Sequence, residues 1–259
     1  MTMVKYVLKL EDLVNLKYLQ KCVTIKDKSV TNKHIKIINC EDSYIYINSN
    51  VQTFRMQNCI NCIVFVAAVG KISSIDKCEN CQISVATNFL RVSNSIDTTI
   101  YSYVTQEPIL FGDNRGLILA PHNVGYNDFM QFLKFAKIHL SSVYINNWGK
   151  PIIMNKEEKE MFEIMLPKDY MRMVVPFNSD NCGLNLSPKE YYDVIKEREE
   201  TMNSIKAMIK DAKLLEEQEK ALHVAIQGYF RDWLVSSGNI KNISELVKMI
   251  DINNPTSDN

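Results

Sequence analysis

The first half of the chain reads Asn39-Cys40-Glu41-Asp42-Ser43, then Asn58-Cys59-Ile60-Asn61-Cys62, Lys77-Cys78-Glu79-Asn80-Cys81 and Asn94-Ser95-Ile96-Asp97-Thr98. The steps from Cys40 to Cys59, Cys78 and Ser95 are 19, 19 and 17 residues, and a weaker fifth copy follows at Asn114. A repeat of this length is too short for two packed helices. It fits one coil of a parallel β-solenoid, in which each coil stacks on the one before.

Apolar residues flank every copy of the repeat at alternate positions. After the repeat, the predicted inward columns are Ile45, Val64, Ile83, Ile100, Leu119 and Ile47, Val66, Val85, Ser102. Before it, they are Ile35, Phe54, Ser73, Leu90, Ile109 and Ile37, Met56, Ile75, Val92, Phe111. This period of two indicates half-buried strands, so we expect two strands per coil. The corner between them carries Asp42, Asn61, Asn80 and Asp97, residue types that tolerate a left-handed backbone.

The fold predicted from these patterns is mainly β with α: a right-handed parallel β-helix, an α/β wrap and a long C-terminal helical segment. We expect a lead-in over residues 1–32, the β-helix over 33–124, the wrap over 125–185 and the helical segment over 186–259. In the wrap, a short helix is predicted for Tyr126 to Ile138 and a strand for Met171 to Phe177.

The C-terminal segment has the signals of a helix start and of amphipathic helices. Ser187 is the expected N-cap, followed by Pro188 at the first position and Glu190 in a capping box. Two apolar stripes follow, Ile205, Met208, Ile209, Ala212, Leu215 and then Leu222, Ile226, Tyr229, Phe230, Trp233.

Composition narrows the function classes. Lysine plus arginine equals aspartate plus glutamate, 30 of each, so we expect no nucleic-acid partner. We expect no signal peptide and no membrane span, because charges interrupt every apolar run. Seven cysteines in such a chain are expected to be reduced thiols. No Gly-rich phosphate loop or catalytic constellation is recognisable, and we expect no cofactor.

Zinc is the alternative interpretation of the cysteines. Cys59-x2-Cys62 and Cys78-x2-Cys81 are separated by 15 residues, a spacing that tetrahedral zinc sites often have. The neighbouring coils have Cys40 and Ser43, and Ser95 and Thr98, at the same positions. Small residues packed at an inner corner explain all four coils, whereas zinc explains two, so we predict no metal site.

The chain resembles the TBCC-domain family, also called C-CAP/cofactor C-like, and within it the centrosomal subfamily. The residues that carry the resemblance are Cys59-x-x-Cys62 with Val64 to Gly70, Ile83 to Thr87, Pro108 to Asn114 and Leu119 to Asn123. In the second half they are Val174 to Phe177, Leu186 to Arg198, Glu217 to Lys220 and Tyr229 to Leu234.

The resemblance implies a non-enzymatic cytoskeletal organiser or scaffold in the cytoplasm, at a centrosome, basal body or spindle pole. Such a protein acts in organelle positioning and cell morphogenesis. Its partners would be cytoskeletal or centrosomal proteins, with tubulin or a small GTPase among the candidates. The C-terminal helical segment is expected to support self-association.

An enzyme-regulating role is the alternative that the resemblance implies. In the family, an exposed arginine activates GTP hydrolysis by tubulin or an Arf-like GTPase, and such a finger is worth about 10³–10⁵ in rate. Arg91 falls at the family's Gln-x-Arg motif, with Phe89 in place of the glutamine. Our strand register places Arg91 outward in a column with Lys36, Arg55 and Ser74. Lys36, Arg55 and Arg91 are therefore the candidate partner-binding residues, and Arg91 is the candidate arginine finger. Actin-monomer binding, as by the related domain of cyclase-associated proteins, is a third alternative.

Overall fold

The computed structural model of the chain describes residues 10–126, 128–138, 146–154, 161–177 and 187–236. The chain divides into two units, Met1–Ile195 and Lys196–Asn259. The first unit contains the strands and the second contains most of the C-terminal helices, and each is described by itself.

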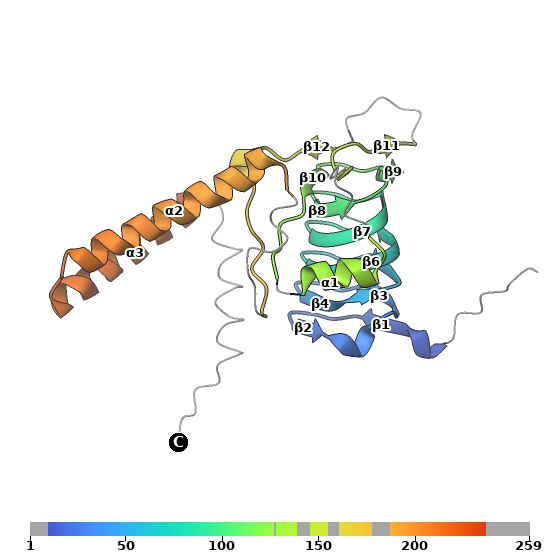
Figure 1. Cartoon of the computed structure of the whole chain (residues 1–259), viewed down its shortest axis with the longest axis horizontal. Helices are drawn as coiled ribbons and strands as arrows, with labels where there is room; N and C mark the ends of the chain where they lie inside the picture. The colour runs from blue at the N-terminus through green and yellow to red at the C-terminus, as the bar shows by residue number, and fades with distance from the viewer. Residues whose placement is uncertain (1–9, 127, 139–145, 155–160, 178–186, 237–259) are drawn as a thin grey trace, which may run out of the picture. The chain divides into compact units, whose positions relative to one another are not determined.

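A 12-stranded parallel sheet winds through the first unit as a β-solenoid (Figure 1). Its strands are β1 (Leu13–Lys17), β2 (Val23–Lys26), β3 (His34–Ile38), β4 (Tyr44–Val51), β5 (Thr53–Gln57), β6 (Ile63–Asp76), β7 (Gln82–Ser93), β8 (Thr99–Val104), β9 (Ile109–Phe111), β10 (Ile118–Pro121), β11 (Ile152–Ile153) and β12 (Glu163–Ile164). Every strand pairs with strands of adjacent coils. The solenoid predicted from the repeat is confirmed.

The predicted inward columns after the repeat form the centre of the core. Ile45, Val64, Ile83, Ile100 and Leu119 are Cα partners from coil to coil, and all are fully buried. The corner residues Asp42, Asn61, Asn80 and Asp97 have φ values of 48°, 53°, 49° and 45°. The left-handed corner predicted from these residue types is therefore confirmed.

The last predicted column before the repeat is wrong by one residue. Arg91 pairs with Ile109 and Val92 pairs with Leu110, so the fully buried residue of β9 is Leu110. The reason is an extra residue in the corner, where the left-handed positions are Gly112 and Gly116, four apart, instead of three apart as in Asn94 and Asp97. A one-residue slip moves every side chain of a strand to the opposite face.

The solenoid is also longer than the sequence indicated, at both ends. In the predicted lead-in, β1 pairs with β3 and β2 pairs with β4, which adds a coil before His34. In the predicted wrap, β11 pairs with β9 and β12 pairs with β10, which adds a partial coil after Pro121. Residues 171–177, predicted as a strand, form no regular element.

Helix α1 (Phe129–Phe135) covers one outer face of the solenoid, over β4 and β6. Phe129 and Phe132 are buried there in a second apolar cluster with Phe65 and Tyr126, while Phe135 remains exposed. Short 3-10 helices lie at Leu10–Asp12, Lys28–Val30 and Pro167–Asp169. The predicted helix is thus present, but shorter than Tyr126 to Ile138.

His122 and Ser187 connect the last described coils to the start of the C-terminal helix. The Tyr170 hydroxyl donates to the carbonyl oxygen of His122 at 2.6 Å, and the Ser187 hydroxyl donates to the same oxygen at 2.9 Å. The hydroxyl of the predicted N-cap residue is therefore committed to a tertiary contact. Within the described residues, neither ring nitrogen of the fully buried His122 has a hydrogen-bond partner.

The C-terminal segment forms two long helices, as predicted. Helix α2 (Lys189–Asp211) begins in the first unit, where Tyr191 and Ile195 are buried, and continues into the second. Helix α3 (Glu216–Ser236) follows a short turn. The side chain of Trp233 and residues 237–259 lie outside the described part of the chain. Within the described residues, no helix is long and apolar enough to cross a bilayer.

Candidate functional site

A column of basic side chains lies on the outer face that β3, β5, β6 and β7 form. Cα pairing places Lys36 beside Arg55, Arg55 beside Ser74, and Ser74 beside Arg91. We call Lys36, Arg55, Ser74 and Arg91 the basic column. Its register is the one predicted from the sequence. Adjacent strands are about 4.8 Å apart, so the basic column spans about 14 Å of a rigid face.

The three cations of the basic column form no ion pair within the described residues. Arg55 and Arg91 are exposed, and Lys36 is half-buried. Like charges on neighbouring strands repel one another, which costs stability unless a partner supplies negative charge. The basic column is therefore suited to an acidic protein surface.

Neighbouring side chains hold Arg91 in place. Its Nε donates to Ser74 Oγ at 3.0 Å, and its Cζ lies 5.6 Å from the centre of the Phe111 ring. An arginine fixed through Nε and an aromatic face loses less side-chain entropy when its terminal nitrogens bind a carboxylate or phosphate. The sequence missed Phe111 as a contact of Arg91, because it placed Phe111 inside the core. The extra corner residue before Gly116 is the signal that could have revealed it.

Two exposed apolar residues lie beside the basic column. Phe89, which stands in place of the family glutamine, pairs with Ile72 across the sheet, and their exposed fractions are 51% and 37%. On the same face, His34 Nδ1 lies 2.8 Å from Thr53 Oγ1. Burial, together with Lys71 and Lys36, lowers the pKa of His34. The face thus combines positive charge with a small apolar contact, as many protein-docking surfaces do.

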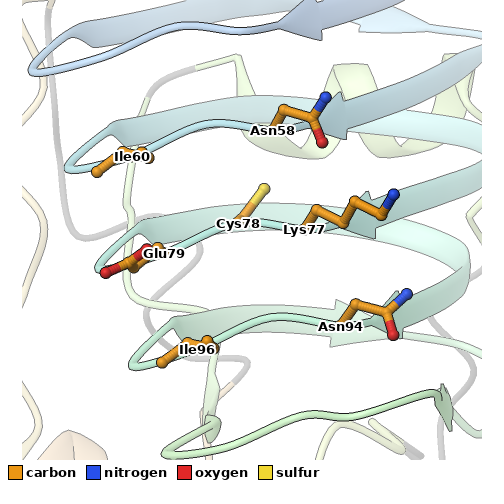
Figure 2. A pocket seen from close by; sticks show the side chains of 7 residues that line it. All are labelled: Asn58, Ile60, Lys77, Cys78, Glu79, Asn94 and Ile96. Atoms are coloured by element: carbon orange, nitrogen blue, oxygen red, sulfur yellow. The ribbon is translucent and has the colours of Figure 1, made fainter.

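A second candidate is a depression of about 300 Å³ along the corner of three coils, around Lys77, Cys78 and Glu79 (Figure 2). Its polar groups are mostly engaged. Asn58 Nδ2 donates to Asn39 Oδ1 at 3.2 Å, and Asn94 Nδ2 donates to Asp76 Oδ1 at 3.1 Å. These bonds belong to a ladder that holds successive coils together. The depression therefore fits a structural corner better than a binding site.

The cysteines inside the corner make the same contacts as the hydroxyls that replace them. Cys62 and Cys81 Sγ donate to the carbonyl oxygens two residues earlier, each at 3.3 Å. The hydroxyls of Ser43 and Thr98 make the same bond at 2.7 and 2.9 Å. Hydrogen bonding with Cys40 and Cys62, together with burial, raises the pKa of Cys59. Among the described residues, no group of three or more Cys, His, Asp or Glu could hold a metal ion.

A β-solenoid with an outward basic column is thus the class of protein that the geometry defines. Residues 32–153 match the family model described as Tubulin binding cofactor C. The chain therefore contains a TBCC domain, as the sequence resemblance indicated.

Curated relatives match beyond this domain. TBCC domain-containing protein 1 of Xenopus tropicalis is 25% identical over 225 residues, which cover 85% of this chain and 41% of the relative. The Homo sapiens protein of that name is 22% identical over 224 residues, which cover 85% of this chain and 40% of the relative. The chain spans about two fifths of the length of these relatives. Among solved structures, Tubulin Binding Cofactor C from Leishmania major is 12% identical with a TM-score of 0.38, covering 59% of this chain and 84% of that chain.

Proposed function

We propose that this protein is a non-enzymatic cytoskeletal scaffold that docks an acidic partner on the basic column. The observation that supports this proposal is the set of three unpaired cations on one rigid face of a TBCC domain. Relatives named TBCC domain-containing protein 1, matched over 85% of the chain, favour a cytoskeletal setting. The proposed location is the cytoplasm, at a centrosome, basal body or spindle pole. There the protein would help to position organelles and shape the cell.

The partner is proposed to be a cytoskeletal or centrosomal protein, with tubulin or a small GTPase as candidates. Attraction between the basic column and an acidic surface would speed association and would weaken as salt screens the charges. Neither a nucleic acid nor a cofactor is part of the proposal.

Cell imaging tests the proposal. A tagged wild-type chain should concentrate at the microtubule-organising centre, and the variant Lys36→Glu/Arg55→Glu/Arg91→Glu should become diffuse. A matched control is Lys134→Glu/Lys137→Glu, because these exposed lysines lie on and just after α1, over a different face. A wild-type chain that is itself diffuse would contradict the proposed location. Equal enrichment of the wild type and the basic-column variant would contradict the proposed docking face.

GTPase activation is the second candidate, and the anchored, outward guanidinium of Arg91 favours it. Phe89 in place of the glutamine weighs against it, as does the position of the guanidinium over Phe111. Single-turnover GTP hydrolysis by tubulin and by Arf-like GTPases separates the two functions. Acceleration by the wild type that is lost in Arg91→Ala would establish a finger. If no GTPase is accelerated, the scaffold role is left as the better account of Arg91.

A further inference from the structure

The described helices of the second unit expose large apolar side chains on both sides of their connecting turn. On α2, the exposed fractions of Met202, Ile205 and Met208 are 53%, 46% and 65%. On α3, Ile226 and Tyr229 are 50% and 83% exposed. Soluble monomers rarely leave apolar residues gathered in this way, because burying them is favourable. These two helices therefore have the surface of an unfinished helical bundle.

The apolar residues of α2 follow a heptad spacing. Ile195, Met202 and Ile209 are seven residues apart, and Ile205 and Ala212 form the second apolar position of each heptad. Spacings of three and four residues place such side chains along one seam of a helix, as in coiled coils. At 1.5 Å per residue, the 23 residues of α2 extend about 34 Å. This length is sufficient for a coiled-coil contact.

The charges of α2 are complementary to those of a second α2 that runs in the opposite direction. Glu197, Glu199 and Glu200 lie in its first half, whereas Lys206 and Lys210 lie in its second half. In an antiparallel pair centred between Asn203 and Ser204, Met202 comes opposite Ile205 of the second copy. The same register brings Glu199 beside Lys206 of the second copy, in the flanking positions that join antiparallel helices.

We propose that two copies of this chain associate through their α2–α3 helices, with the two α2 helices antiparallel at the seam. The contact is self-complementary, since each residue pair occurs twice about a two-fold axis, and such a contact closes as a dimer. Two copies supply four helices, and the apolar stripes of the α3 helices complete a four-helix bundle. This assembly is independent of the docking role of the basic column.

Light scattering after size-exclusion chromatography of the full chain tests the dimer. At about 50 µM, far above the dissociation constants of specific dimers, the wild type should have twice the 29.9 kDa mass of one chain. Met202→Glu and Ile205→Glu should each give a monomer, because they place a charge in the seam. Met130→Glu on α1 is the matched control, since Met130 is 49% exposed and Met202 is 53% exposed. That variant should remain dimeric.

Charge exchange tests the antiparallel register. Glu199→Lys and Lys206→Glu should each weaken the homodimer at least about tenfold, because either change turns two attractions into two repulsions. A mixture of the two variants should form heterodimers by preference, since both pairs are then opposite in charge. Circular dichroism should show unchanged helix content, which separates loss of association from loss of folding.

Three results would overturn the proposal. The first is a wild-type chain that is monomeric at about 50 µM. The second is a dimer that survives both Met202→Glu and Ile205→Glu, because the copies would then associate through another surface. The third is a mixture of the charge variants without preference for the heterodimer, which would exclude the antiparallel register.

Discussion

The buried His122 should make the protein sensitive to mild acid. Its ring is fully buried and stacks on Phe129, with 5.0 Å between ring centres. Burial lowers the pKa of His122 from its ordinary 6.5 to about 3. As the pH falls below 6.5, the unfolded chain takes up a proton that the folded chain cannot accept until about pH 3. The free energy of unfolding therefore decreases through this window.

The size of the effect follows from the distance between pH 5 and the ordinary pKa. That distance is 1.5 pH units, and each unit is worth about 1.4 kcal/mol, so His122 should remove about 2 kcal/mol of stability between pH 7.5 and pH 5. Urea denaturation followed by circular dichroism at both pH values measures the loss. His34, whose pKa is also lowered, adds a loss of the same sign. The informative quantity is therefore the difference between wild type and a variant without His122.

His122→Leu is that variant, because it keeps an apolar side chain of similar volume and cannot take up a proton. We expect it to be as stable as wild type at pH 7.5, within about 1 kcal/mol, since the lost stacking is offset by removal of two unsatisfied nitrogens. At pH 5 it should be more stable than wild type by about 2 kcal/mol. If the two proteins lose the same stability between these pH values, the buried and unpartnered state of His122 is refuted.

Three further substitutions test the corners and the helices. Gly112→Ala should lower the free energy of unfolding by about 2 kcal/mol, because φ is +72° there and a Cβ would lie 2.4 Å from Asn94 Oδ1. Gly228→Ala, with no atom within 4 Å of the added Cβ, should instead increase helicity and stabilise α3 by up to about 1 kcal/mol. Lys77→Asn should raise the melting temperature, since Lys77 has a φ of 54° where other coils have asparagine, and relieving this strain is worth about 1 kcal/mol. Cys62→Ser should cost less than about 1 kcal/mol and Cys62→Leu 1–3 kcal/mol, and EDTA should leave the melting temperature unchanged; a marked fall with EDTA would instead indicate a metal site.

The core was predictable because equivalent residues recur at fixed distances. Ile45, Val64 and Ile83 lie 19 residues apart, so their common inward position can be found in the sequence and is confirmed in the structure. The first coil was not predictable in this way. Its inward positions carry Thr24 and Lys26, which pair with Ile45 and Ile47. A terminal coil covers the core on one side only, and a polar residue there opposes edge-to-edge aggregation. The apolar signal is therefore absent where the solenoid ends.

The same register locates the candidate docking face, but it does not give the conformation of the side chains on that face. If Ile35, Phe54 and Leu90 point inward, the next residues Lys36, Arg55 and Arg91 must point outward, so the alternation places the basic column together with the core. What holds Arg91 depends on a contact with the following coil, where an insertion changes the register. The ring of Phe111 is outside only because one extra residue lies between the two glycines of that corner. The position of a functional residue thus follows from the repeat, whereas its orientation depends on the single coil that departs from it.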